Sequence, residues 1–296
     1  MVPAGLSSLS LLWHAAGGIL GVCGANDRSC MAEPLLLSDE LTIDLGSVRI
    51  VDGLSFRLEA GRTLGVVGES GCGKSMTALA VMGLVPSPSR LAGRLQFEGR
   101  DLLAMPEDVR RGLRGRRMAM IFQEPMTALN PVVPVGVQIG EMLVVHEGFS
   151  PGAAERRAVA LLDRVGIAAP DQRARAYPHE LSGGMRKRAA LIRTLVYDPP
   201  MILMDEPFAA VDAQTRIQLQ EDLLRLWSFK RKTIIFVTHD ITEAIALGDR
   251  ALVLTQRPAR IAAEHPISIP RPRNVKDIFT APGFGSIYER IRADVQ

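Results

Sequence analysis

The chain has 296 residues, of which 47% are hydrophobic and 23% are charged, and its formal net charge at pH 7 is +3. This length is sufficient for one large α/β core with a smaller subdomain inserted into it. So mild a positive charge does not indicate a nucleic-acid-binding protein, and Cys23, Cys30 and Cys72 have the spacing of neither a metal site nor a disulfide framework.

Residues 1–32 differ in character from the rest of the chain. The stretch from Leu6 to Val22 is apolar, yet no lysine or arginine precedes it, so the positively charged start of a signal peptide is missing. Its glycines also weaken this stretch as a helix. We expect Met31 to be the natural start or the residues before it to be disordered, and a lipid-facing anchor is the alternative.

A strand, a glycine-rich loop and a helix are predicted next. Thr63 to Val67 is a short apolar run that indicates a buried strand, and Met76 to Val85, which ends before Pro86, indicates a helix. Between them the loop has the pattern G-x-x-x-x-G-K-S, formed by Gly68, Glu69, Ser70, Gly71, Cys72, Gly73, Lys74 and Ser75. Such a loop holds phosphate with its backbone N–H groups; Lys74 is expected to reach the outer phosphates and the Ser75 hydroxyl to bind Mg²⁺. A glycine-rich turn without a ligand is the alternative.

The middle of the chain predicts a further strand and two helices. Met118 to Phe122 indicates a strand that ends at Gln123, and residues 154–165 carry apolar side chains on one face, which is typical of an amphipathic helix. A second helix is expected from Met185 to Tyr197, preceded by Ser182, Gly183 and Gly184. These three residues lack bulk, so their N–H groups can approach a phosphate closely; taken alone, they read as a loop with a helix cap.

An acidic pair closes the next predicted strand. Met201 to Met204 indicates a strand buried in a parallel sheet, so Asp205 and Glu206 are expected to emerge at its carboxyl end, where ligands of open α/β sheets bind. Asp205 suits Mg²⁺, which prefers oxygen ligands, and Glu206 is placed to orient or deprotonate the water that attacks a γ-phosphate. An acidic turn is the alternative, which the phosphate-binding loop disfavours.

A last buried strand is expected from Thr233 to Thr238, directly before His239. Asp240 and Glu243 have the spacing of a capping box. We therefore expect them to open a helix from Ile241 to Leu247 and to hold His239 in place.

Together these segments resemble the ATP-binding cassette family, the nucleotide-hydrolysing subunits of ABC transporters. The segment Leu181-Ser182-Gly183-Gly184-Met185 resembles the family's signature motif, Gln123 its Q-loop and His239 its switch histidine, and Phe208 to Asp212 resembles its D-loop. The resemblance covers about Leu41 to about Arg260. It implies an α/β fold of the P-loop NTPase type, with a RecA-like parallel-sheet core, an antiparallel β subdomain and an inserted helical subdomain.

The resemblance also implies domain bounds. They are an N-terminal extension at 1–32, an ATPase domain at 33–265 with its helical subdomain at about 125–185, and a C-terminal tail at 266–296. The family commonly stacks adenine on an aromatic residue, and the corresponding position here is Leu45, which can pack against the ring but cannot offer π-stacking.

In the family, two cassettes pack head to tail, and each ATP lies between the P-loop of one subunit and the signature motif of the other. The resemblance implies a catalytic set of Glu206, His239 and Gln123, with His239 sensing the γ-phosphate. It implies Mg²⁺ ligands at Ser75, Gln123 and Asp205, and a dimer contact at Asp212. ATP and Mg²⁺ are the implied cofactors.

The two halves of the chain resemble different importers. Residues 122–131 are similar to the Q-loop of dipeptide, oligopeptide and nickel importers. Residues 197–216, residues 236–244 and the segment from Ile269 to Arg273 resemble nitrate, sulfonate and taurine importers instead. We therefore expect a mosaic chain that changes character near the signature motif.

The implied function is the ATP-hydrolysing subunit of an importer of a small solute. Its implied partners are a second cassette, integral membrane permease subunits and, indirectly, an extracytoplasmic solute-binding protein, with no nucleic acid. The cassette has no apolar stretch of membrane-spanning length, so we expect the channel in a separate polypeptide and this chain at the cytoplasmic face of the membrane. The alternative is a soluble cassette ATPase that acts as a nucleotide-gated binding module in DNA repair or translation.

Overall fold

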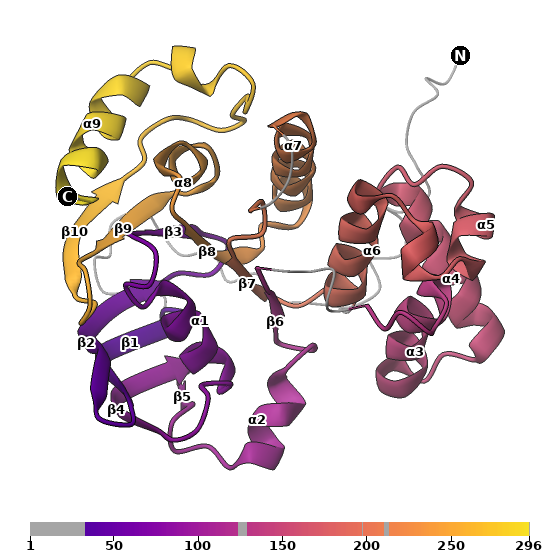
Figure 1. Cartoon of the computed structure of the whole chain (residues 1–296), viewed down its shortest axis with the longest axis horizontal. Helices are drawn as coiled ribbons and strands as arrows, with labels where there is room; N and C mark the ends of the chain where they lie inside the picture. Colours follow the sequence, from indigo (N-terminus) through magenta and orange to yellow (C-terminus); the bar gives the residue numbers. More distant parts are fainter. Residues whose placement is uncertain (1–32, 124–128, 197, 210–212, 296) are drawn as a thin grey trace, which may run out of the picture. The chain divides into compact units, whose positions relative to one another are not determined.

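The computed structural model describes residues 33–123, 129–196, 198–209 and 213–295. The chain from Glu33 onward forms one compact unit that contains two β-sheets and a separate group of helices (Figure 1). No helix in these ranges has both the length and the apolar character needed to cross a bilayer.

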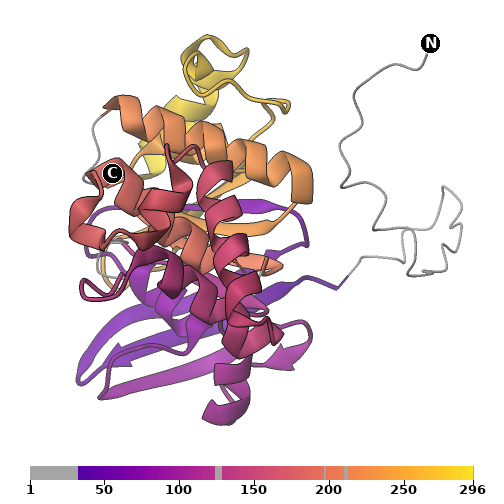
Figure 2. The same ribbon diagram turned by 90° about the vertical axis from the view of Figure 1, so that its right-hand side faces the viewer.

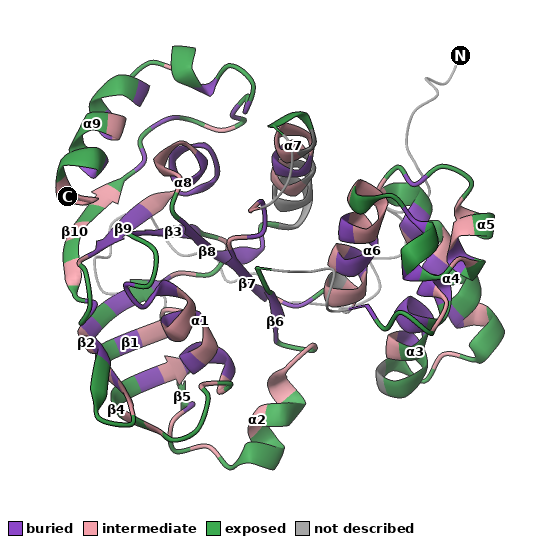
Figure 3. Ribbon diagram, viewed as in Figure 1, coloured by how far each residue is buried: buried purple, intermediate pink, exposed green. Residues whose placement is uncertain are grey.

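A six-stranded sheet forms the centre of this unit, in the order β10-β9-β3-β8-β7-β6. All neighbouring strands are parallel except β10, which is antiparallel to β9. Strands β3, β7 and β8 are buried along their whole length (Figure 3), so the polar residues that follow them emerge at one carboxyl edge. The strands are β3 (Thr63–Val67), β6 (Met118–Ile121), β7 (Met201–Asp205), β8 (Thr233–Thr238), β9 (Arg250–Leu254) and β10 (Ile261–Pro266).

A second sheet has four antiparallel strands in the order β2-β1-β4-β5. Helix α1 (Lys74–Met82) lies between the two sheets in Figure 1. The face of the central sheet that packs against α1 shares one apolar cluster with the antiparallel strands. This cluster extends from Leu36 on β1 to Leu252 on β9. The strands are β1 (Leu36–Leu45), β2 (Val48–Leu58), β4 (Ser89–Phe97) and β5 (Arg100–Asp101).

Four helices gather beyond β6 and have an apolar core of their own (Figures 1 and 2). That core includes Ile139, Leu162 and Ala189, which come from three of the helices. Helix α2 (Glu107–Leu113) precedes β6. The four helices are α3 (Val135–Glu147), α4 (Pro151–Arg164), α5 (Pro170–Arg175) and α6 (Gly183–Leu195), with a short 3₁₀ turn at Pro178–Glu180 before α6.

The C-terminal segment packs into the second large core cluster. Ile267, Phe284 and Ile291 are buried there together with residues of β8 and β9. The helical elements of this cluster cover the face of the central sheet opposite to α1. They are α7 (Ala213–Lys230), α8 (Ile241–Leu247), a 3₁₀ turn at Ile278–Thr280 and α9 (Phe284–Val295). The expected boundary between residues 265 and 266 falls at the end of β10, so the tail continues from the sheet.

The expected elements are present, with some changed ends. The strands at Thr63–Val67 and Thr233–Thr238 and the helix at Ile241–Leu247 have the expected bounds. Helix α1 ends at Met82 rather than near Val85, because Gly83 adopts a left-handed conformation with a φ of 63° and caps it. Helix α6 begins earlier than expected, with Ser182 as its N-cap.

The expected capping box at Asp240 and Glu243 is half right. The Asp240 carboxylate accepts hydrogen bonds from the N–H groups of Thr242 and Glu243, which confirms it as the N-cap of α8. The prediction for Glu243 is wrong: the Asp240 N–H donates instead to the Thr238 hydroxyl, and the Glu243 side chain turns inward to other partners.

Candidate functional site

The glycine-rich loop connects β3 to α1 and surrounds its own lysine. Only 4% of Lys74 is exposed. Its Nζ donates hydrogen bonds to the carbonyl oxygens of Gly68, at 2.8 Å, and Glu69, at 2.6 Å. The ammonium group is thus held inside the loop.

Glycine is required where the loop turns into the helix. Gly73 has a φ of 125°, and a Cβ there would lie 3.1 Å from Ala259 Cβ and 3.2 Å from Ile50 O. A Cβ at Gly71 would meet no atom within 4 Å. The loop therefore lies tightly against β2 on one side and leaves open space at Gly71, and its backbone is a cradle of the kind that takes a phosphate.

Ser75 and Asp205 meet beside this cradle. The Ser75 Oγ donates a hydrogen bond of 2.9 Å to Asp205 Oδ1, from the first turn of α1 to the end of β7. Burial raises the pKa of the Asp205 carboxyl; the hydrogen bond from Ser75 opposes this, Glu206 adds to it and Lys74 opposes it. A hydroxyl and a buried carboxylate are hard oxygen donors, and a nearby cation would offset the cost of burying the charge. The pair therefore fits Mg²⁺.

Glu206 and His239 also meet at this edge of the sheet. His239 Nδ1 lies 3.2 Å from Glu206 Oε2, with the glutamate side chain 15% and the histidine side chain 62% exposed. The Glu206 N–H donates to the carbonyl of Val237 on the neighbouring strand. Its φ of 44° is uncommon for a residue other than glycine, and such strained backbone concentrates at functional sites.

The other expected site residues that the structure describes have no hydrogen bond to this pair. Gln123 is exposed two positions beyond Ile121, which pairs with Met204 of β7. Ser182 accepts a hydrogen bond from the Met185 N–H at 3.3 Å, and Gly183 is exposed beside it at the start of α6. Neither Gln123 nor this start of α6 has a hydrogen bond to the glycine-rich loop within the described ranges. Asp212 lies outside the described residues.

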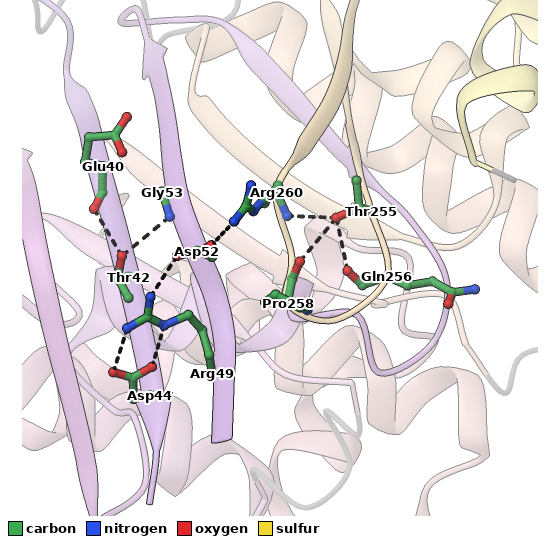
Figure 4. A network of polar contacts seen from close by, with 10 residues as sticks. All are labelled: Glu40, Thr42, Asp44, Arg49, Asp52, Gly53, Thr255, Gln256, Pro258 and Arg260. Carbon is green, nitrogen blue, oxygen red and sulfur yellow. Dashed lines mark hydrogen bonds and ion pairs between the residues drawn. The ribbon is translucent and has the colours of Figure 1, made fainter. Parts of the chain in front are cut away.

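Leu45 ends β1, opposite Val48 of β2 and Ser89 of β4, and packs half-buried against the core. A polar network extends from this hairpin to the β9–β10 connection (Figure 4). Arg49 forms ion pairs with Asp44, at 2.9 Å, and Asp52, at 3.1 Å, and Arg260 also pairs with Asp52.

The β9–β10 connection also contacts the glycine-rich loop. Gln256 Nε2 donates to Glu69 Oε2 at 2.8 Å, and Arg257 Nη2 donates to Gly71 O at 2.9 Å. Neither residue is recognisable from the sequence, because partners 187 and 186 positions apart leave no signal in local spacing. The two hydrogen bonds therefore attach the Glu69–Gly71 part of the loop to the β9–β10 connection.

A family model described as ABC transporter matches residues 51–209 of the chain. The chain belongs to the ABC transporter family. Its match spans the glycine-rich loop, the signature segment and the acidic end of β7. The expected cassette fold, with a parallel core, an antiparallel sheet and a helical group, is confirmed.

The relatives of this ABC family member include peptide transport proteins. It is 43% identical over 211 residues to the oligopeptide transport ATP-binding protein OppD of Bacillus subtilis, covering 71% of this chain and 59% of OppD. It is 40% identical over 225 residues to the dipeptide transport ATP-binding protein DppD of Escherichia coli, covering 74% of this chain and 69% of DppD. The chain thus spans less than two thirds of the length of Bacillus OppD.

A solved structure confirms the fold of the cassette. The dimeric post-hydrolysis state of the ATP-binding cassette MJ0796, bound to ADP and Pi, aligns with a TM-score of 0.68 at 23% identity. The alignment covers 78% of this chain and 98% of that one.

The mosaic character expected from the sequence finds no support in these relatives. An alignment of 211 residues is longer than the part of the chain before the signature motif at residue 182, so the similarity to OppD continues beyond the expected switch point. The tail residues from Ile269 to Arg273, which suggested an anion importer, have a structural role. Arg273 is buried and donates to main-chain carbonyls at the end of α8.

Proposed function

We propose that this chain is the ATP-binding and ATP-hydrolysing subunit of an ABC importer for peptides. The observation that carries the ATPase proposal is the meeting of Ser75 with Asp205, and of Glu206 with His239, at the carboxyl edge of one parallel sheet. The names and the identity of the peptide-type relatives support the cargo.

Each residue of the site has a role in this proposal. The glycine-rich loop, residues 68–75, binds the phosphates, and Lys74 leaves the carbonyls of Gly68 and Glu69 to reach them. Glu206 accepts a proton from the attacking water, and His239 contacts the γ-phosphate and keeps the carboxylate in place. Mg²⁺, bound by Ser75, Gln123 and Asp205, would supply charge neutralisation at the phosphates.

The signature segment completes the site of a second cassette. Ser182 and Gly183 are exposed at the N-terminus of a 13-residue helix, where N–H groups and the helix dipole favour an anion. They have no bond to the glycine-rich loop of their own chain in the described ranges, so we assign them, with Gly184, to the ATP held by the partner. We also place Asp212 at that interface.

The remaining assignments follow from an importer. The helical subdomain, at about residues 125–185, contacts the membrane permease, and the exposed Val132, Val137 and Val145 support this surface. The ATPase domain is residues 33–265 and the tail 266–296. The complex lies at the cytoplasmic face of the membrane and receives its peptide through an extracytoplasmic solute-binding protein.

Purification from native membranes tests the importer against the soluble alternative. We expect the tagged chain to be recovered with an integral membrane permease and to hydrolyse ATP faster when the solute-binding protein and a short peptide are supplied. Recovery with ribosomes or DNA and without a permease would favour a nucleotide-gated module of translation or repair.

Ser182→Arg should prevent the two cassettes from closing over the ATP that the partner holds. The long cation would occupy the place of the γ-phosphate contact, and loss of such donors costs about 100-fold or more in turnover. We expect ATP binding at the same chain's loop, measured by calorimetry, to be unchanged. Gln172→Arg, on an exposed position of α5 in the same subdomain, is the control and should hydrolyse ATP like the wild type. Normal turnover in Ser182→Arg would remove the signature segment from the site.

Leu45→Tyr should strengthen nucleotide binding. An aromatic ring at the end of β1 adds stacking on adenine, worth about 0.5–1.5 kcal/mol, which corresponds to an increase in affinity of about 2- to 10-fold. Titration with ATP and GTP measures the change, and Val109→Tyr is the control because Val109 is exposed on α2, outside the β1–β2 hairpin. Tight binding with a strong ATP preference in the wild type would show that Leu45 does not weaken the base site.

A further inference from the structure

A buried carboxylate is hydrogen-bonded to Thr238, the residue before the switch histidine. Only 7% of Glu243, in the first turn of α8, is exposed. The hydroxyl of Thr238 donates to its Oε2 at 2.7 Å, and Nε2 of Gln220 donates to its Oε1 at 3.0 Å. Thr238 ends β8 and Gln220 belongs to α7, so one carboxylate joins a strand and two helices.

The Thr238 hydroxyl fixes the backbone on both sides of His239. While it donates to Glu243, it accepts a hydrogen bond of 3.0 Å from the Asp240 N–H. Asp240 in turn caps α8. Because the His239 ring is largely exposed, the position of its Nδ1 beside Glu206 depends on this backbone segment more than on packing around the ring.

Gln220 attaches α7 to the same carboxylate. It is buried two turns into this helix, which begins at Ala213, directly after the D-loop position in the sequence. A displacement of α7 therefore acts on the Glu243 side chain, and through Thr238 it acts on the segment that carries His239.

Burying a carboxyl group at position 243 costs free energy of folding that an apolar side chain, packed in the same place, would not. Burial raises the pKa of the Glu243 carboxyl, and the hydrogen bond from Thr238 opposes this effect. Replacing buried ionic groups by well-packed apolar side chains is often neutral or stabilising, so packing alone does not require a glutamate here. A glutamate offers something an apolar side chain lacks, namely two acceptor oxygens that receive donors from opposite sides.

We propose that Glu243 is a positioning residue of the ATP site, which holds the Thr238–Asp240 segment and helix α7 together and thereby sets His239 against Glu206. This inference rests on the proposed ATP hydrolysis. Glu243 acts through Thr238 and does not itself contact the nucleotide.

The main test compares Glu243→Leu with Glu243→Gln. Leucine fills the space without acceptors, so turnover should fall by about 10- to 100-fold, as expected for a catalytic group displaced by a fraction of an ångström to one ångström, while the Kd for ATP stays unchanged. In Glu243→Gln, the new side-chain carbonyl still accepts from Thr238, and the new amide donates to Gln220 once the Gln220 amide is flipped. This variant should retain most of the wild-type turnover.

The controls distinguish a positioning role of Glu243 from an effect on folding stability and from an effect of its charge. Glu221→Leu removes a carboxylate from the position of α7 next to Gln220, where it pairs with the exposed Lys276 at 3.3 Å, and should hydrolyse ATP like the wild type. Thermal unfolding of each variant shows whether it folds. If Glu243→Gln loses as much turnover as Glu243→Leu, the residue acts through its charge and the positioning role is overturned. Wild-type turnover in a folded Glu243→Leu protein overturns it as well.

A measurement without ATP distinguishes this inference from the proposed function. The Asp240 amide proton is held by Thr238, so it should exchange with solvent faster in Glu243→Leu and in Thr238→Val than in the wild type, by about tenfold or more. Unchanged exchange in both variants contradicts the inference even if ATP hydrolysis is confirmed. Faster exchange in the variants of a protein whose wild type shows no ATPase activity would contradict the proposed function alone.

Discussion

Glu206→Gln should bind ATP with normal affinity and hydrolyse it about 100- to 10,000-fold more slowly than the wild type, the range that a general base contributes. Glutamine keeps the shape of the side chain and a hydrogen bond to His239, but it cannot accept the proton of the attacking water. The nucleotide should then remain bound and hold two cassettes together. Single-turnover hydrolysis and size-exclusion chromatography with ATP measure both effects.

The matched control for this variant is Glu264→Gln, which changes a surface carboxylate on β10 that pairs with Arg250. It should leave turnover unchanged. If Glu206→Gln hydrolyses ATP at the wild-type rate, the carboxylate at the end of β7 is not the base, and the proposed mechanism fails at its central step.

Arg273→Met should lower the free energy of unfolding by at least about 3 kcal/mol, because several buried carbonyls lose a charged donor at about 1–3 kcal/mol each. The guanidinium donates to Ile245 O at 2.7 Å and to Ala246 O, Gly248 O, Ile269 O and Ile267 O. Burial lowers the pKa of Arg273 to about 10, with Arg271 adding to the effect and Asp249 opposing it, so the side chain is still cationic at neutral pH. Methionine matches its length but donates nothing.

Denaturant unfolding measures this change, and Arg292→Met is the control. Arg292 is an exposed arginine of α9 that pairs with Glu289 at 3.8 Å. Its replacement should change the free energy of unfolding by less than about 0.5 kcal/mol, as is usual for surface positions. Equal effects of the two substitutions would show that the carbonyls at the end of α8 do not depend on Arg273.

The sequence predicted the parts of the site in which local pattern determines position. A buried strand before Gly68 and another before Asp205 place both at the same edge of a parallel sheet, and the Ser75–Asp205 bond follows from this arrangement. The meeting of Glu206 and His239 follows in the same way, because β7 and β8 are neighbours in the sheet.

Contacts between distant segments could not be predicted in this way. Arg273 donates to a carbonyl at the end of α8 from 28 positions away, and this role has no local signal because a buried arginine and an exposed one look alike in a sequence. The interpretation of its segment as a mark of another importer class finds no support in the relatives. The role of Glu243 has no local signal either. Its spacing from Asp240 fits a capping box, but the Thr238 hydroxyl competes for the Asp240 N–H, and the carboxylate turns toward α7.

The ammonium group of the glycine-rich loop forms hydrogen bonds inside the loop itself. Lys74 already has two carbonyl acceptors in its own loop. Nucleotide binding at the proposed site would therefore exchange these acceptors for phosphate oxygens, and the net gain would be the difference between the two sets of hydrogen bonds. A multiply charged phosphate chain is a stronger acceptor for the Lys74 ammonium group than two neutral carbonyls. A ligand without phosphates provides no acceptor to replace them. In the proposed site, discrimination between ATP and adenosine would therefore begin in the glycine-rich loop, independently of any contact between the base and Leu45.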